Sequence, residues 1–449
     1  MILALVLPVW SAGFLTSEGG VVATGRGNAY VAGADDLSAQ SWNPAALTRL
    51  DRAVQLQLAG VHQRVVFDRQ DEADLGFDEV RNLAPPMLIP GLAAATSFGR
   101  QDLTLAFGFY SPYAPLWSYA PQGPQRFTST RSTVLSGNVG PSLAWRFADR
   151  LSVGLGVAWT FLTVEQSLVA HVSPLSFSAT DDPAYDVSTT ISARDLFELT
   201  WNAGLLYEDP SGRYALGGGY TPAVRFEPRG SMSVDFSNNT YYLGDGNFGK
   251  VIASPRAEDP DVGLEVALPH QVRLGALVRP QERWEIELDL VWQGWSILDG
   301  LVVDDLALEI DTELPEDVTI TGPVGLPLEL QDSWSARLGT ELDLSGRVQG
   351  RAGVFFESSA ASRENRSVLM PDGNKLGYGL GASWQARPKL AVDLGWSQSF
   401  VPRREIETTW VYQLQIDPQS GQVGAGKPVG RGELAVTNSA LALGLRFTP

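Results

Sequence analysis

The chain has 449 residues, no cysteine and a formal net charge of −18 at pH 7. This acidic balance argues against a nucleic-acid partner, which needs clustered Lys and Arg to replace phosphate counterions. Without cysteine there are no disulfides, no thiolate chemistry and none of the commonest structural zinc sites. No stretch has 18 uninterrupted apolar residues, so we expect no membrane-spanning helix.

The first fifty residues do not resemble strands. Residues 1–12 are a short apolar run that ends in Ser11 and Ala12, typical of a secretory signal peptide whose basic start is missing. An ordinary apolar strand is the alternative. Residues 13–50 are rich in Gly, Ala and small polar residues, and they need an outside surface to become ordered. We predict helical turns near 34–40 and 44–50, with Asn43 as the cap and Pro44 in the first turn.

From residue 52 onward, apolar and polar side chains alternate in fourteen segments, as they do along a strand. The segments are 52–67, 91–99, 102–110, 130–147, 151–167, 195–208, 213–226, 266–279, 284–292, 332–344, 347–357, 375–386, 389–402 and 434–447.

The segment 284–292 shows the alternation most clearly. Trp284 and Trp292 end an apolar face, whereas Glu285, Glu287 and Asp289 occupy the opposite face. Its length of roughly 26 Å, once tilted, is close to the ~25 Å apolar band of an outer-membrane barrel. Indole rings suit the two water–lipid boundaries. We therefore expect the apolar face to meet lipid and the carboxylates to meet a wet lumen. A strand of a soluble sandwich is the alternative for this segment alone.

The connections between the segments alternate in length. Tight turns at 148–150, 210–212, 280–282, 345–346 and 387–388 separate long connections at 68–90, 111–129, 168–194, 227–265, 299–331, 358–374 and 403–433. Short turns on one side and long loops on the other are typical of outer-membrane barrels, and an even strand number brings both ends to one side. We predict an all-β protein: a 14-stranded antiparallel transmembrane β-barrel over 51–449, monomeric, in contact with outer-membrane lipid and lipopolysaccharide.

Further motifs occur at 12–14, 25–30, 34–36, 42–47, 268–275, 292–296, 370–372 and 377–381. Together they resemble the FadL-type outer-membrane transporters of long-chain fatty acids and other hydrophobic compounds. The resemblance implies that residues 13–50 form a partly helical hatch in the lumen, with Asn43, Pro44 and Ala45 as its signature and Phe14 and Leu15 as contacts of an apolar pocket. It also implies capture by loops, rearrangement of the hatch and sideways exit at a kink in the third strand.

Three groups of residues are candidates for contact with a ligand. Inward-facing Arg273, Arg337 and Arg351 could bind a carboxylate, or could pair with other lumen charges that pin the hatch. Gly and Pro weaken a strand, so the third strand either kinks or simply ends at its Pro-rich stretch; the kink candidates are Gly108, Ser111, Pro112 and Pro115. Apolar loop residues form either a landing site or a lid, and those we select are Phe177, Tyr241, Tyr242 and Phe248.

Competing functions have weaker support. The three histidines, His62, His171 and His270, are far apart in sequence and belong to no catalytic motif. We therefore expect neither an enzyme nor a bound cofactor or metal. A general porin is the other alternative, and single-channel conductance distinguishes it from a barrel closed by a hatch.

Overall fold

The computed structural model describes residues 19–70, 76–171, 181, 183–235, 240–243, 250–253, 256–257, 260–298, 300–304, 306–311, 318–321, 324–416 and 423–449. The expected signal peptide, residues 1–12, lies outside them. Within these ranges, no helix combines the length and apolar character that a membrane crossing requires.

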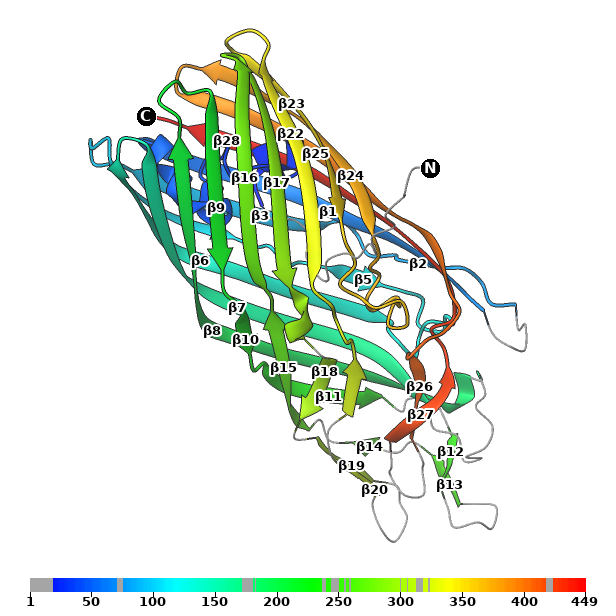
Figure 1. The fold of residues 1–449 in the computed structure, drawn as a ribbon. Helices are drawn as coiled ribbons and strands as arrows, with labels where there is room; N and C mark the ends of the chain where they lie inside the picture. Colours follow the sequence, from blue (N-terminus) through cyan, green and yellow to red (C-terminus); the bar gives the residue numbers. More distant parts are fainter. Residues whose placement is uncertain are drawn as a thin grey trace.

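Fourteen antiparallel strands close into a barrel, and β28 pairs with β1 to complete the ring (Figure 1). Each of the fourteen segments predicted from the sequence corresponds to one of them. They are β1 (Arg52–Arg69), β3 (Met87–Thr96), β4 (Leu103–Tyr110), β6 (Arg131–Ala148), β7 (Leu151–His171), β8 (Asp186–Glu208), β9 (Tyr214–Thr221), β16 (His270–Gln281), β17 (Trp284–Gly294), β22 (Ser333–Asp343), β23 (Val348–Glu357), β24 (Lys375–Arg387), β25 (Leu390–Ile406) and β28 (Gly432–Phe447).

The remaining short elements lie in the long connections, and many of them gather at the lower end of the barrel in Figure 1. They are β2 (Val80–Arg81), β5 (Leu116–Ser118), η2 (Pro183–Tyr185), β10 (Val224–Phe226), β11 (Arg229–Asp235), β12 (Thr240–Leu243), β13 (Lys250–Ala253), β14 (Arg256–Ala257), β15 (Asp261–Leu268), η3 (Trp295–Ile297), β18 (Gly300–Asp304), β19 (Ala307–Asp311), β20 (Val318–Thr321), β21 (Val324–Pro327), β26 (Tyr412–Ile416) and β27 (Val423–Pro428).

Some predicted boundaries were wrong. The range 168–194 is not all loop, because β7 continues to His171 and β8 already begins at Asp186. The extension of β8 is rich in Ser and Thr, so the hydrophobic pattern does not reveal it. The second strand lies at 87–96 instead of 91–99. The predicted strands 213–226 and 266–279 are interrupted at Pro222 and Pro269, since proline cannot donate to a ladder.

Apolar side chains cover the outside of the barrel. Leu288 and Leu290 of β17 are exposed between Trp284 and Trp292, as the alternation predicts. Trp292 lies 6.4 Å from Trp334 of the next strand, at the loop end of the apolar band. A belt of this kind matches the lipid-facing surface of outer-membrane barrels.

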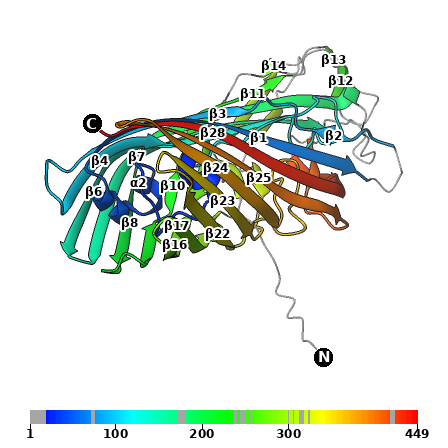
Figure 2. The same cartoon turned by 90° about the horizontal axis from the view of Figure 1, so that it is seen from above.

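The hatch, described from Gly19 to Leu50, lies inside the ring of strands (Figure 2). It contains α1 (Val21–Gly25), α2 (Ala39–Trp42) and η1 (Pro44–Arg49). The second helical turn was predicted well and the first was predicted a few residues too early. The helix α1 was not predicted, because its first residue has no side-chain cap.

Candidate functional site

The charged face of β17 binds the backbone of the hatch. The Glu287 carboxylate accepts hydrogen bonds from the backbone N–H groups of Ala32 (2.6 Å) and Gly33 (2.9 Å). Asp289 accepts from the N–H groups of Tyr30 (2.6 Å) and Val31 (3.0 Å). Both carboxylates are 0% exposed. The expectation of a wet environment was therefore wrong here, because backbone donors of the hatch take the place of water.

Arg26 carries the charge that these carboxylates need. Its guanidinium lies 2.8 Å from Glu287, 3.2 Å from Glu285 and 3.8 Å from Glu341. Arg351 in turn donates to Glu341 at 2.5 Å. Buried charges are tolerated when they are paired in this way. The hatch and the wall thus share one buried ionic network.

Arg337 also belongs to this attachment. It donates to the backbone oxygen of Asn28 in the hatch (3.3 Å) and lies 3.7 Å from Glu357. These contacts and those of Arg351 agree with the interpretation that most lumen charges pin the hatch.

The wall has glycines where the hatch approaches most closely. A Cβ on Gly353 would overlap the backbone oxygen of Arg26, and a Cβ on Gly154 would overlap the backbone of Pro44. A glycine inside a strand often marks such an approach of another backbone. Glycines at inward positions of the strands are therefore a sequence signal for the places where the hatch contacts the wall.

Asn43 joins the hatch to the wall. Its Oδ1 accepts from the N–H of Ala45 (3.2 Å), which caps η1 as predicted. Its Nδ2 donates to the backbone oxygens of Val31 in the hatch and Leu205 in β8, both at 3.0 Å. Pro44 and Ala45 are buried beside it. The predicted signature is thus a structural joint between two parts of the chain.

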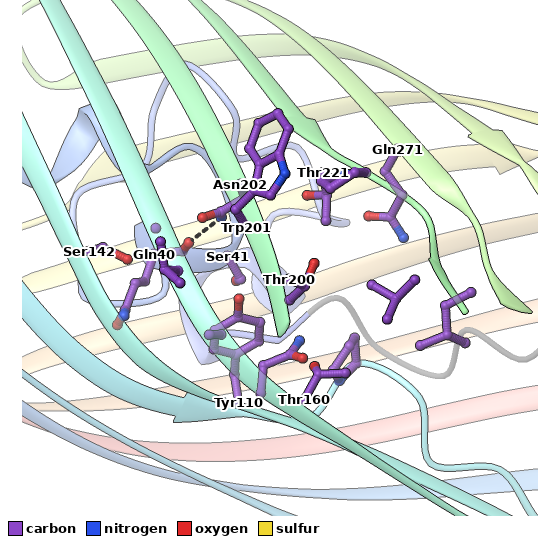
Figure 3. Close-up of a pocket in the computed structure, with 18 of the residues that line it drawn as sticks. Gln40, Ser41, Tyr110, Ser142, Thr160, Thr200, Trp201, Asn202, Thr221 and Gln271 are labelled. Atoms are coloured by element: carbon purple, nitrogen blue, oxygen red, sulfur yellow. Dashed lines mark hydrogen bonds between the residues drawn. The ribbon is translucent and has the colours of Figure 1, made fainter. Parts of the chain in front are cut away.

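A cavity lies between the hatch and the wall (Figure 3). Gln40 and Ser41 of the hatch line one side, and residues from β6, β7, β8, β9 and β16 line the others. Arg273 lines it too, whereas neither Arg337 nor Arg351 does. The guanidinium of Arg273 lies 5.7 Å from the ring centroid of Trp42 in the hatch and donates to Thr221 at 3.4 Å.

The cavity has unused hydrogen-bonding capacity. Oε1 of Gln40 and the hydroxyls of Thr160 and Thr200 are buried on its lining and have no hydrogen-bond partner in the protein. A buried polar atom without a partner costs about 1–3 kcal/mol. These groups therefore favour a ligand with a polar part in this cavity.

The third barrel strand is interrupted and then resumes. β4 ends at Tyr110, and β5 pairs with the same neighbour, β6, from Leu116 onward. In between, the N–H of Ser136 in β6 donates to the backbone oxygen of Tyr113 (2.9 Å). Ser111, Pro112 and Pro115 thus lie within an interruption of a strand and not at the start of a free loop. Gly108 lies before it, in an ordinary pair with Gly140.

A gap separates this interruption from the neighbouring strand β3. The last β3–β4 pair is Leu92↔Phe109, and the next backbone contact is the hydrogen bond from Leu83 to Ser118 (2.7 Å). No backbone pairing joins residues 84–91 to 110–117, all of which the structure describes. Two smaller cavities flank the gap, and both include Tyr110 and Gly19, the first described residue of the hatch.

A family model described as "Outer membrane protein transport protein (OMPP1/FadL/TodX)" matches residues 3–448. The chain belongs to this family. It is 24% identical to the long-chain fatty acid transport protein of Salmonella typhi, over 86% of this chain and 87% of the relative. It is also 24% identical to outer membrane protein P1 of Haemophilus influenzae, over 84% of each chain.

Solved structures share the fold of this FadL-family protein. A Pseudomonas aeruginosa FadL homologue matches 97% of this chain and 100% of its own, with a TM-score of 0.76 and 16% identity. The Pseudomonas putida toluene transporter TodX matches 96% of this chain and 98% of its own, with a TM-score of 0.65 and 15% identity. The protein is therefore a β-barrel of the bacterial outer membrane.

Part of the predicted site of this FadL-family protein is not described. Phe14, Leu15, Phe177 and Phe248 lie outside the described residues, and for Tyr241 and Tyr242 only the backbone, in β12, is described. The structure adds residues that the sequence did not single out: Gln40, Ser41, Trp42, Thr160, Thr200, Asn202 and Gln271. For Thr160, Thr200, Asn202 and Gln271 the available signal was a polar residue at an inward position of a strand.

Proposed function

We propose that the protein takes up long-chain fatty acids, or similar hydrophobic molecules with a polar end, across the outer membrane. The observation that carries the proposal is the cavity between the hatch and the wall, which Arg273 lines. Relatives over most of the chain are named long-chain fatty acid transport proteins, which supports the same substrate class. Arg can bind a carboxylate through two parallel hydrogen bonds.

The proposed route runs from the loops to the cavity and out through the wall. Loop residues Phe177, Tyr241, Tyr242 and Phe248 capture the ligand, and Arg273 holds its carboxylate in the cavity. The ligand then reaches the pocket beside Phe14 and Leu15 at the start of the hatch. Rearrangement of the hatch lets it leave sideways at the interruption formed by Ser111, Pro112 and Pro115. The smaller cavities on both sides of Tyr110 support this last step.

The role of Arg273 is tested with two substrates that differ in charge. In cells that depend on this protein for uptake, Arg273→Ala is expected to abolish palmitate uptake and to spare uptake of uncharged toluene. Arg81→Ala is the control, since Arg81 is exposed and pairs with the neighbouring Glu79 (2.8 Å). Palmitate uptake at the unsubstituted rate would refute the carboxylate site.

The sideways exit is tested by restoring backbone donors to the third strand. Pro112→Val together with Pro115→Val is expected to close the gap to β3 and slow palmitate uptake, because each substitution adds an N–H that can enter a ladder. Pro388→Val, in the turn between β24 and β25, is the control. Unchanged uptake by a barrel that is still folded, judged by its heat-modifiable migration on gels, would contradict lateral exit.

A further inference from the structure

The wall has a second gap, between β8 and the strand formed by β9, β10 and β11. β8 pairs with β9 up to Ala203↔Tyr220 and pairs again with β11 from Arg194↔Arg229. The register is the same on both sides, so each strand has eight residues in the interval, 195–202 in β8 and 221–228 in its neighbour. No backbone pairing joins these two stretches, which the structure describes in full. We call this interval the β8 seam.

The seam has local causes in the sequence. Pro222 and Pro228 lie at its two ends and have no N–H to donate. On the other side of β8, the register with β7 shifts between Thr160 and Leu162, where β8 accommodates an extra residue. Such bulges bend a strand and increase its twist. β10 remains paired with β15, so on this part of the sheet only the β8 side is open.

Side-chain acceptors bind two of the backbone N–H groups in the seam. The N–H of Glu227 donates to Oδ2 of Asp195 (3.1 Å), and the N–H of Ala223 donates to Nδ1 of His270 (3.2 Å). In a membrane, unpaired backbone is tolerated only where it is buried in protein or lines a water-filled cavity. The side-chain bonds and the adjoining cavity meet this condition.

The cavity beside Arg273 borders the seam. Thr200, Trp201 and Asn202 line it from β8, and Thr221, Pro222 and Val224 line it from the opposite side. Thr200 is 8% exposed and faces the lumen, whereas its neighbour Trp201 is 43% exposed on the outer surface. Successive strand residues point to opposite faces, so only the thickness of the wall at the seam separates this cavity from the outside.

The outer end of the seam lies at the lipid boundary. Trp201, Tyr220 and His270 form an aromatic group, with ring centroids 5.5 Å and 6.3 Å apart. Such rings mark the membrane–water interface. Above Trp201, the apolar side chains of Leu199 and Phe197 are 66% and 81% exposed.

We propose that the β8 seam is a side port through which a single-chain amphiphile enters the lumen cavity from the outer leaflet of the membrane. The proposal rests on the proposed function and adds an entrance that is separate from the interruption in the third strand. The chain of the ligand passes between 195–202 and 221–228, and its polar end meets Thr200 and Arg273 inside.

The port is tested by cross-linking its two sides. Leu199 and Arg225 are exposed on the two sides of the seam, and the chain contains no native cysteine. A Leu199→Cys, Arg225→Cys variant is joined by a thiol-cleavable bifunctional reagent, and palmitate uptake is measured before joining, after joining and after reduction. Uptake is expected to be lost on joining and to return on reduction. Uptake that is unaffected by joining would overturn the proposal.

A matched pair controls for the reagent. Leu274→Cys and Leu290→Cys face each other on the outside of the paired strands β16 and β17, where a cross-link closes nothing. Palmitate uptake by this variant should be unaffected by joining.

Labelling separates the port from the transport function. A diazirine-bearing palmitate, photoactivated in outer membranes that contain the unsubstituted protein, is expected to label 195–202 or 221–228. If the unsubstituted protein takes up no palmitate, the proposed function alone is refuted, because labelling needs no transport. An absence of label from both stretches would refute the port.

Discussion

At the scale of single residues, the barrel is specialised to hold a segment of its own chain. The carboxylates of Glu287 and Asp289 bind four backbone N–H groups of the hatch, and Arg26 supplies the compensating charge. Periodicity shows only that these carboxylates face inward. It does not show that they bind backbone groups, because their partners are more than 250 residues away in sequence.

Removing the charge of Arg26 should destabilise this attachment. Arg26→Met leaves the Glu287 carboxylate buried without its cation, and breaking a buried pair in this way costs about 3–5 kcal/mol. We expect a lower urea midpoint and a larger ion current in planar bilayers. The same substitution at exposed Arg81, whose ion pair is worth about 0–1 kcal/mol, is the comparison. Equal effects at both positions would refute the specific role of Arg26.

The close contact between wall glycines and the hatch leads to a separate prediction. Gly353→Ala places a methyl group against the backbone oxygen of Arg26, and overpacking of this kind typically costs about 1–3 kcal/mol. The hatch should become more accessible to protease while the barrel remains folded. Gly263→Ala is the control, because a Cβ there meets nothing within 4 Å. If the hatch stays as resistant to protease as in the unsubstituted protein, the wall shifts to accommodate the methyl group, and the prediction is wrong.

At the scale of elements, the orientation of each strand follows from its alternation. Leu288 is exposed near the middle of β17, so Leu288→Arg should destabilise the protein by about 2–4 kcal/mol in lipid. Leu344, just beyond the turn end of β22, is exposed near the boundary, where Arg costs about 0–1 kcal/mol. Unfolding in lipid vesicles measures both. A cost at Leu344 equal to that at Leu288 would contradict the assigned lipid face.

The strands could be predicted from the sequence because each must present an apolar face to lipid. The alternation is less informative where a strand leaves the membrane, because no side of the strand then has to face lipid. The polar extension of β8 above the membrane carries no apolar stripe and was taken for loop. The sequence placed Pro112 at a possible kink, but the gaps beside β3 and β8 depend on pairing between strands. Similarly, Arg273 could not be distinguished from Arg337 until their contacts were known.

At the scale of the whole molecule, the ring and the hatch are distinct parts. The ring closes through β1 and β28 without any bond from the hatch. Deleting residues 13–50 should therefore leave a closed barrel with a wide lumen. We expect single-channel conductance to rise from a closed baseline to that of a steady open pore. Conductance as low as that of the full chain would contradict the role of the hatch as the barrier.

The pairing of β1 with β28 also has a consequence for biogenesis, because the barrel cannot close before β28 is present. Sixteen pairs, from Val54↔Phe447 to Arg69↔Gly432, join the first strand of the barrel to its last. Until β28 is in place, two long strand edges remain uncovered, and such edges attract other chains. The unfolded polypeptide therefore needs an escort across the periplasm, and a chain that stops before β28 yields a sheet that cannot close.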